Sequence, residues 1–248
     1  MKILRFLAVV LATATPVAAQ QGEMTPAERN AFRAEVRAYL LDNPEVLIEA
    51  MEILRAREEA AEAAADTQLL AALGDRVYND GVSWVGGNPD GDVTIVEFLD
   101  YRCGYCRRAH NEVKALLEED GNIRWVVKEL PILGPDSDAS SRMALATLKT
   151  LGDEAYSRLH DVLMTFEGPV NAQTMSLIAR RADVDLVAIQ AAMESEEVSH
   201  HIGSVRLLAQ QLNVTGTPAF VIGGTMVRGF IPKDTMNQII AEERANAG

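Results

Sequence analysis

Cysteine is nearly absent from this sequence. Only two cysteines occur among its 248 residues, and both stand in one C-x-x-C motif, Cys103 and Cys106. A disulfide closing so short a ring stabilises a fold by roughly 2 kcal/mol, against about 4.7 kcal/mol for a 100-residue loop. This small gain argues against a purely structural disulfide and favours a chemical role for the pair.

The sequence also lacks the ligand pattern of a structural zinc site. One C-x-x-C supplies two sulfur ligands where such a site needs four, and no two histidines have H-x₃₋₅-H spacing. We therefore expect no metal and no cofactor other than the redox-active disulfide that Cys103 and Cys106 can form. Copper(I), a soft ion that accepts thiolates, stays open as a ligand of these two thiols.

Positive charge and long apolar runs are scarce as well. The net charge is −13, so the chain repels nucleic acid phosphates and anionic lipid surfaces, and we expect protein partners and no nucleic acid. No segment has the roughly 20 consecutive apolar residues of a membrane span.

Residues 1–19 have the pattern of a secretory signal peptide. Basic Lys2 and Arg5 precede a short apolar run, and the small residues 17–19 suit cleavage before Gln20. The pattern predicts export to the periplasm, where disulfides persist.

Residues 20–72 predict a helical arm followed by a spacer. Thr25, Pro26 and Glu28 form a capping box with proline at the first helical position. Apolar residues then recur at helical spacing on two helices separated near residues 42–44, and an Ala/Glu-rich stretch follows at 55–65. The apolar positions are Phe32, Val36, Tyr39 and Leu40 in the first helix, and Leu47, Met51 and Leu54 in the second.

These two apolar stripes need a surface to cover them. They could pack on the same chain or on a second copy of it. We favour the second copy, because the polar stretch at 55–65 is interpreted as a spacer between the arm and the rest of the chain. The arm therefore predicts a homo-oligomer.

Residues 73–248 predict one α/β domain. A buried strand at 93–99, a helix to about 119 and a second strand at 123–130 form a βαβ unit. Residues 81–91 are expected to be turns. Only helices are expected at about 134–212, which we interpret as an inserted all-helical domain. The expected helices are 137–151, 154–166, 172–181, 186–193 and 196–212, followed by strands at 219–222 and 226–227 and a last helix from 232.

The C-x-x-C motif stands where the first strand of this unit ends and its helix begins. Cys103 would face the orphan N–H groups and the positive end of the helix dipole, which favour a nucleophilic thiolate. Cys106 lies on the same helix face, within disulfide reach, and would be the resolving thiol. Arg102, Arg107 and Arg108 either add positive potential or form a solvated helix start, two interpretations between which the sequence does not decide.

Two separated motifs resemble the DsbA-like periplasmic thiol–disulfide oxidoreductases. They are residues 97–106, which contain both cysteines, and Gly-Thr-Pro-Ala-Phe at 216–220. The resemblance covers roughly residues 75–248 and implies a thioredoxin-like fold with an inserted helical domain. It also implies that Pro218 follows a cis peptide bond facing the cysteines, and that Thr217 offers its backbone to a substrate peptide.

The same resemblance implies that Glu97 is a buried acid beneath the cysteines. Burial raises the pKa of a carboxyl group, so Glu97 could take and return the proton of Cys106 during exchange. Lys128 on the next strand is its candidate charge partner. An outward-facing Glu97 is the alternative.

Two details differ from the oxidase pattern, in which Pro-His separates the cysteines. Here Gly104 and Tyr105 separate them, and we expect both to contact substrate; Thr217 precedes the proline. Both details resemble the DsbC-type disulfide isomerases. Residues 36–47 of the arm resemble the N-terminal region of the suppressor-of-copper-sensitivity (ScsC) type, whose members can be oligomeric isomerases.

We therefore predict an enzyme, a periplasmic thiol–disulfide oxidoreductase that acts on exported proteins carrying thiols or disulfides. We favour a disulfide isomerase or reductase that a membrane redox partner keeps reduced. A DsbA-type oxidase that introduces disulfides is the alternative. A copper(I)-binding or holdase protein is an alternative of another class.

Overall fold

The structure is a computed structural model that describes residues 24–247. It divides into two compact units, with the boundary after Arg57. The signal peptide predicted for residues 1–19 lies outside the described residues. Among the residues that are described, no helix is both long and apolar enough to cross a membrane.

The first unit contains helix α1 (Pro26–Asp42) and the beginning of helix α2 (Glu45–Tyr78). The predicted capping box is present: the Thr25 hydroxyl accepts the N–H of Glu28, and the Glu28 carboxylate accepts the N–H of Thr25. At the other end of α1, the N–H of Asn43 donates to the Tyr39 carbonyl, and Pro44 then precedes α2. The arm thus folds as two helices, as the sequence predicts.

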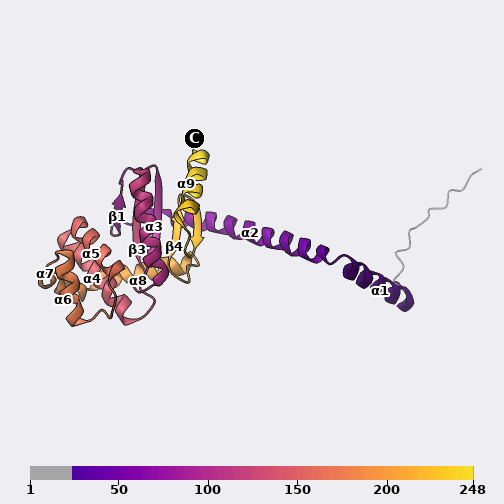
Figure 1. Cartoon of the computed structure of the whole chain (residues 1–248), viewed down its shortest axis with the longest axis horizontal. Helices are drawn as coiled ribbons and strands as arrows, with labels where there is room; N and C mark the ends of the chain where they lie inside the picture. Colours follow the sequence, from indigo (N-terminus) through magenta and orange to yellow (C-terminus); the bar gives the residue numbers. More distant parts are fainter. Residues whose placement is uncertain (1–23, 248) are drawn as a thin grey trace, which may run out of the picture. The chain divides into compact units, whose positions relative to one another are not determined.

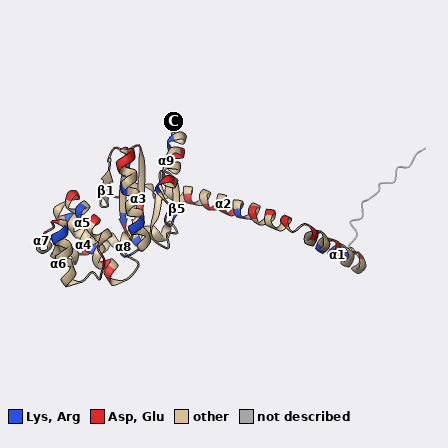
Figure 2. Ribbon diagram, in the orientation of Figure 1, with Lys and Arg blue, Asp and Glu red and all other residues tan. Residues whose placement is uncertain are grey.

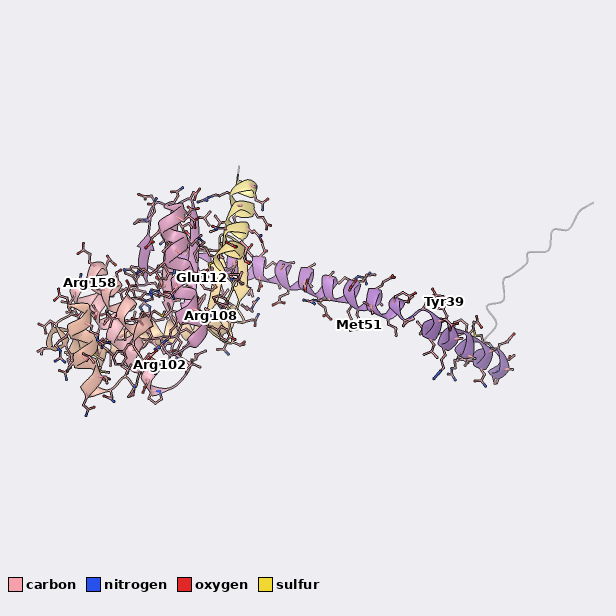
Figure 3. The ribbon with its side chains drawn as sticks, in the orientation of Figure 1. Tyr39, Met51, Arg102, Arg108, Glu112 and Arg158 are labelled. Carbon is pink, nitrogen blue, oxygen red and sulfur yellow. The ribbon has the colours of Figure 1, made fainter. Side chains whose placement is uncertain are left out.

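The predicted apolar stripes lie on the surface of this first unit. Tyr39 and Met51, labelled in Figure 3, are 56% and 70% exposed. Leu40 is the most shielded member and is half-buried. The other exposed members are Phe32, Val36, Leu47 and Leu54.

Helix α2 continues through the segment where we expected a spacer. Its C-terminal part belongs to the second unit, where Leu70 and Val77 are buried in the core. Both carboxylate oxygens of Asp66 accept from the guanidinium of Arg228, at 2.7 and 2.8 Å. Alanine and glutamate favour a helix over a flexible linker, and these buried side chains supply the tertiary packing that a polar helix needs. The core therefore begins well before residue 73.

A five-stranded sheet forms the centre of the second unit, with strand order β1-β3-β2-β4-β5. The parallel pair β2–β3 is connected by helix α3 (Gly104–Asp120), and all other neighbouring pairs are antiparallel. The strands are β1 (Trp84–Gly87), β2 (Val93–Leu99), β3 (Ile123–Glu129), β4 (Ala219–Ile222) and β5 (Thr225–Arg228).

Strand β1 corrects our expectation of turns over residues 81–91. Its two glycines are required by packing. A Cβ on Gly86 would stand 2.2 Å from the Trp84 ring, and one on Gly87 would stand 2.4 Å from the Ile123 carbonyl oxygen. The buried Trp84 ring packs edge-on against Trp125, with ring centroids 5.3 Å apart. Burial of one large side chain therefore makes a strand of a segment whose local composition favours a turn.

The sheet is covered on both faces, as the continuous apolar runs of β2 and β3 predict. One core cluster joins the sheet to α3 and to α9 (Lys233–Ala247). The other joins it to the C-terminal part of α2 and to α8 (Glu196–Gln211).

The inserted helical domain lies between β3 and β4 and begins with α4 (Pro135–Leu151). Figure 1 shows α4 to α7 gathered at one end of the sheet. The ends of all five predicted helices of the insertion agree with the structure within two residues. The remaining members are α5 (Asp153–Thr165), α6 (Ala172–Ala182), α7 (Leu186–Met193) and α8. The predicted thioredoxin-like α/β fold with an all-helical insertion is confirmed.

Candidate active site

The C-x-x-C motif stands at the N-terminus of α3, directly after β2. Cys103 is the N-cap residue, with extended backbone angles, and its N–H donates to the Asp100 carbonyl. The buried Asp100 carboxylate accepts three more backbone N–H groups, from Arg102, Ile132 and Leu133, at 2.8, 2.8 and 3.0 Å. Asp100 thereby ties the active-site turn to the loop after β3, a role that the sequence analysis missed.

Cys103 is the more accessible thiol and the more acidic one. It is 8% exposed, whereas Cys106 is fully buried. A hydrogen bond from the Cys106 thiol lowers the pKa of Cys103 to about 5, against the opposing effect of burial. The Thr217 side chain and the backbone N–H groups at the start of α3 contribute in the same direction. A pKa this low favours the thiolate form of Cys103 at neutral pH.

The same hydrogen bond acts in the opposite direction on the second cysteine. Because Cys106 donates to Cys103, its pKa is raised far above the usual range of a thiol. Burial and the negative charge of Glu97 raise it further. The pair thus consists of one nucleophile and one thiol that must lose its proton before it can react.

The second motif lies against the first, as the resemblance implies. The Thr217–Pro218 peptide bond is cis. The Thr217 carbonyl oxygen is 3.1 Å from the sulfur of Cys103. The Pro218 carbonyl accepts the N–H of Gly229, which anchors the loop beside β5.

Glu97 lies on β2 and is fully buried, so the outward-facing alternative is wrong. Its Oε2 accepts the indole N–H of Trp125 at 3.2 Å, and its Oε1 has no hydrogen-bond partner among the described residues. Burial raises the pKa of Glu97 to about 8, and the negative charges of Glu129 and Cys103 add to the shift. Glu97 is therefore an acid that gains and loses its proton near neutral pH, beside a cysteine whose pKa it affects.

Lys128 is not the charge partner of Glu97, contrary to our expectation. Lys128 pairs with Phe98 in the parallel register, so Glu97 points to the opposite face of the sheet. The Lys128 ammonium instead donates to the Asp80 carboxylate at 2.6 Å and to the Arg76 carbonyl at 3.0 Å. This ion pair connects β3 to the segment that follows α2.

A second buried carboxylate lies behind the active-site turn. Glu129, at the end of β3, accepts hydrogen bonds from the hydroxyl groups of Tyr101, Tyr156 and Ser141, at 2.8, 2.7 and 2.8 Å. The Tyr101 hydroxyl is also 3.0 Å from Nδ1 of His160. Burial raises the pKa of Glu129 to about 7. The cluster joins the turn before Cys103 to helices α4 and α5, and the only signal for it in the sequence was an acid at the end of a buried strand.

The three arginines near the motif differ in their surroundings. Arg107 is braced: its guanidinium donates to the carbonyls of Tyr101 and Phe166, at 2.9 and 2.7 Å. Arg102 is half-buried and Arg108 is exposed. Of these three arginines, Arg107 is therefore the one whose hydrogen bonds connect separate segments of the chain.

The two residues between the cysteines are open to solvent. Tyr105 is 59% exposed. A Cβ added at Gly104 would meet no atom within 4 Å, so the backbone there can be approached closely. Both positions are open to solvent, which the predicted contact with a substrate requires.

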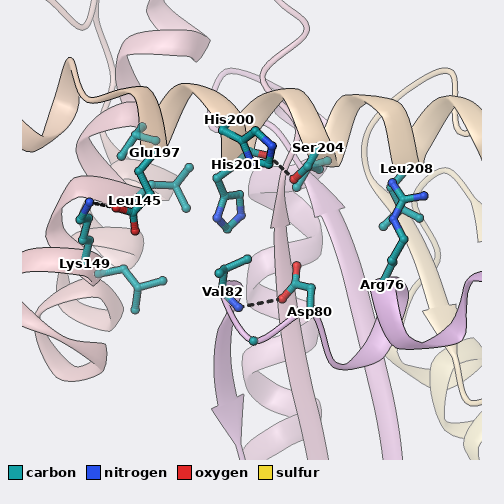
Figure 4. A pocket seen from close by; sticks show the side chains of 14 residues that line it. Arg76, Asp80, Val82, Leu145, Lys149, Glu197, His200, His201, Ser204 and Leu208 are labelled. Atoms are coloured by element: carbon teal, nitrogen blue, oxygen red, sulfur yellow. Dashed lines mark hydrogen bonds and ion pairs between the residues drawn. The ribbon is translucent and has the colours of Figure 1, made fainter.

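No group of three or more His, Cys, Asp or Glu side chains is placed to hold a metal ion in the part of the chain that the structure describes. A pocket of about 530 Å³ lies between α8, α4 and the segment after α2 (Figure 4). His201, Asp80 and Lys149 line it, but neither cysteine nor Thr217 does. This pocket is therefore separate from the thiol site.

Comparisons with known proteins cover both units. Residues 79–242 match the family model described as thioredoxin, and residues 28–61 match that of the copper resistance protein ScsC N-terminal domain. A thioredoxin-like oxidoreductase from Silicibacter pomeroyi is 41% identical; the match covers 69% of this chain and 97% of that chain, with a TM-score of 0.65.

Two further relatives differ in how much of their own length this chain spans. A linker-deletion mutant of Proteus mirabilis ScsC is 26% identical; the match covers 92% of this chain and 100% of that chain, with a TM-score of 0.67. The Na⁺/H⁺ antiporter NhaA 1 of Salinispora arenicola is 30% identical over 58% of this chain, but the chain spans only 22% of the antiporter. The chain belongs to the thioredoxin family, among its DsbA-like and ScsC-like thiol–disulfide exchange proteins.

Proposed function

We propose that this protein is a periplasmic disulfide isomerase or reductase that acts on exported proteins. One observation carries the thiol–disulfide exchange in this proposal: the Cys103 sulfur lies 3.1 Å from the Thr217 carbonyl oxygen, and the pKa of Cys103 is lowered while that of the fully buried Cys106 is raised. This asymmetry suits a thiol that attacks a protein disulfide and a second thiol that resolves the product.

In the first step, the Cys103 thiolate attacks one sulfur of a substrate disulfide. A bond forms between Cys103 and that sulfur, the substrate disulfide breaks, and the second substrate sulfur leaves with the electron pair as a thiolate. The Thr217 backbone beside Cys103 is placed to pair with the extended substrate segment, as in strand addition.

The mixed disulfide then has two outcomes. If another substrate thiolate attacks it, the substrate acquires a new disulfide and Cys103 is released unchanged, which is isomerisation. If Cys106 attacks, its proton passes to Glu97, the Cys103–Cys106 disulfide forms, and the substrate leaves as a dithiol that has gained two electrons. A membrane redox partner would then return the pair to the dithiol.

The arm supports isomerisation rather than simple reduction. Its exposed apolar stripes, together with its match to the ScsC N-terminal domain, favour association of several copies. Several active sites around one misfolded substrate raise the effective thiol concentration, so reshuffling competes with release.

The test keeps the chain at full length. Val36→Asp combined with Met51→Asp places charge in both stripes, whereas Arg37→Asp, next to Val36 on α1, is the matched control. We expect the double variant to be monomeric by light scattering and to lose most isomerase activity on a scrambled multi-disulfide protein. It should still reduce a small disulfide. The control should behave as wild type.

Two results would contradict the proposal. Wild-type protein that is monomeric at micromolar concentration would rule out association through the arm. A monomeric double variant with undiminished isomerase activity would show that isomerisation does not need the arm.

A DsbA-type oxidase is the second candidate, and the acidity of Cys103 favours it. A stabilised thiolate stabilises the reduced protein and makes its disulfide more oxidising. Acid trapping and alkylation of the cysteines in cells separates the two functions: a mostly reduced pair indicates an isomerase or reductase, and a mostly oxidised pair indicates an oxidase.

A further inference from the structure

We propose that Arg108 selects substrate segments in which an acidic residue stands beside the reactive cysteine. The inference rests on the proposed thiol–disulfide exchange and names the class of substrate that the same site prefers.

Arg108 lies over two aromatic rings, one of which belongs to the C-x-x-C motif. Its guanidinium carbon is 4.6 Å from the ring centre of Phe230 and 5.9 Å from that of Tyr105. Tyr105 separates the two cysteines, and Phe230 follows Gly229, whose N–H donates to the Pro218 carbonyl. The guanidinium therefore lies over Tyr105 of the C-x-x-C motif and over Phe230, the residue that follows the Gly229 contact with the cis-proline loop.

The stacked guanidinium leaves its N–H groups free. Within residues 24–247, no carboxylate or carbonyl accepts a hydrogen bond from Arg108. Figure 3 labels Arg108 and Glu112, which stands four residues further along α3. The Glu112 carboxylate accepts the backbone N–H of Lys233 at 3.0 Å instead. Arg107, in contrast, donates to two backbone carbonyls. A planar donor fixed by aromatic rings and lacking an acceptor suits a carboxylate from outside.

The charges of α3 run against its own dipole. Its first turn has no acid and its last turn has no base. Arg107 and Arg108 lie near the N-terminus, while Glu118, Glu119 and Asp120 lie at the C-terminus. Figure 2 shows α3 blue at the end that carries the thiols and red at the other end. Each such placement is unfavourable with respect to the helix dipole, so helix stability does not explain it.

Binding of negative charge does explain the placement. The chain has a net charge of −13, so a basic surface at the reactive thiol stands out against the rest of the molecule. An Asp or Glu beside the substrate cysteine can form a charge-assisted hydrogen bond with Arg108, while a Lys or Arg in that place is repelled.

The experiment uses three peptides of one sequence, each supplied as a disulfide-linked homodimer, with Asp, Asn or Lys beside the cysteine. The second-order rate of reaction with reduced, full-length protein is measured for each. We expect the Asp peptide to react roughly three-fold faster than the Asn peptide, as exposed ion pairs allow, and the Lys peptide to react more slowly than both. The order should flatten at 1 M salt.

Comparing rates between peptides within one variant cancels any change in the reactivity of Cys103. Arg108→Glu should invert the order, and Arg108→Gln should flatten it. Arg181→Glu is the matched control: Arg181 also lies over a ring, that of Phe166 at 5.7 Å, but on α6 of the insertion. It should keep the wild-type order. An unchanged order in Arg108→Glu, or an equal inversion in Arg181→Glu, would overturn the inference.

The Asn peptide separates this inference from the proposed function. If wild type reacts with it but shows no order by charge, only the selection by Arg108 is wrong. If wild type reacts with none of the peptides although Cys103 is readily alkylated, thiol–disulfide exchange itself fails and the inference fails with it.

Discussion

Glu97 and Glu129 are buried carboxylates on adjacent strands, but the structure surrounds them differently. Glu129 accepts hydrogen bonds from three hydroxyl groups, which occupy both of its oxygens. Glu97 accepts one, from Trp125, and its other oxygen has no partner among the described residues. Burial raises the pKa of both, to about 8 for Glu97 and about 7 for Glu129.

This difference in hydrogen bonding indicates different roles for the two buried carboxyl groups. A carboxylate with hydrogen bonds on both oxygens holds its neighbours in place, and Glu129 joins three segments in this way. A carboxylate left short of donors is costly to ionise, and its empty oxygen can receive a proton. Glu97 raises the pKa of Cys106. The carboxyl group with fewer hydrogen-bond donors is therefore the one that interacts electrostatically with the thiols.

The largest effect on stability is expected at Glu129, whose two carboxylate oxygens both accept hydrogen bonds. Glu129→Ala leaves the hydroxyls of Tyr101, Tyr156 and Ser141 buried without their acceptor. We expect the free energy of unfolding to fall by about 3–5 kcal/mol in urea, followed by tryptophan fluorescence.

Glu118→Ala, on the exposed surface of α3, is the control for this prediction and should stay within about 0.5 kcal/mol of wild type. A Glu129→Ala variant as stable as that control would mean that the hydroxyl cluster does not hold the insertion to the sheet.

Glu97→Gln should have the opposite effect on stability. Because its pKa rises from 4.5 to about 8 on folding, folded wild type holds a proton that the unfolded chain has lost between these pH values. Wild-type stability therefore falls as pH rises through this window, whereas glutamine does not titrate. The variant should gain a few kcal/mol relative to wild type between pH 4 and pH 8, measured as the difference in unfolding free energy.

The same variant should resolve mixed disulfides more slowly than wild type. Near pH 7 only the ionised fraction of Glu97 can accept the proton of Cys106. Without that fraction, resolution of a mixed disulfide should slow on the order of a hundredfold in single-turnover measurements. Equal resolution rates for wild type and variant across the pH range would show that Glu97 carries no proton.

The smallest effect is expected for the pKa of Glu97 when its hydrogen-bond donor, Trp125, is replaced. Trp125→Phe removes the indole N–H that favours the charged carboxylate, so the pKa of Glu97 should rise further. The corresponding limb of the pH profile for resolution should move to higher pH by roughly one unit or less.

Trp84→Phe is the matched control, because the buried Nε1 of Trp84 has no hydrogen-bond partner in the described residues. It should leave the pH profile where it is. A profile that moves equally in both variants would reflect packing of the two rings rather than the bond to Glu97.

Most of the fold could be read from local patterns. The helices of the insertion and the strands β2 and β3 follow periodicity and capping, which are properties of neighbouring residues. The exceptions arose where distant contacts outweigh local preference. Strand β1 forms around buried Trp84, and α2 extends through its Ala/Glu-rich part because Asp66 and Leu70 find partners on the core.

The amino-acid sequence by itself determined which groups can do the chemistry. Spacing placed Cys103 and Cys106 at a helix start, and the resemblance pointed to Glu97 and to the cis bond before Pro218. These features are local or belong to motifs that any reader of the chain can see.

Only the tertiary structure decided how those groups are surrounded. Glu97 and Lys128 face opposite sides of the sheet because of the register between β2 and β3. The sequence of either strand alone does not determine that register. Glu129 receives hydroxyls from three parts of the chain, and Arg108 lies over a ring contributed from beyond β5. A pKa depends on the donors, charges and burial around a group, and those come from residues that only folding brings together.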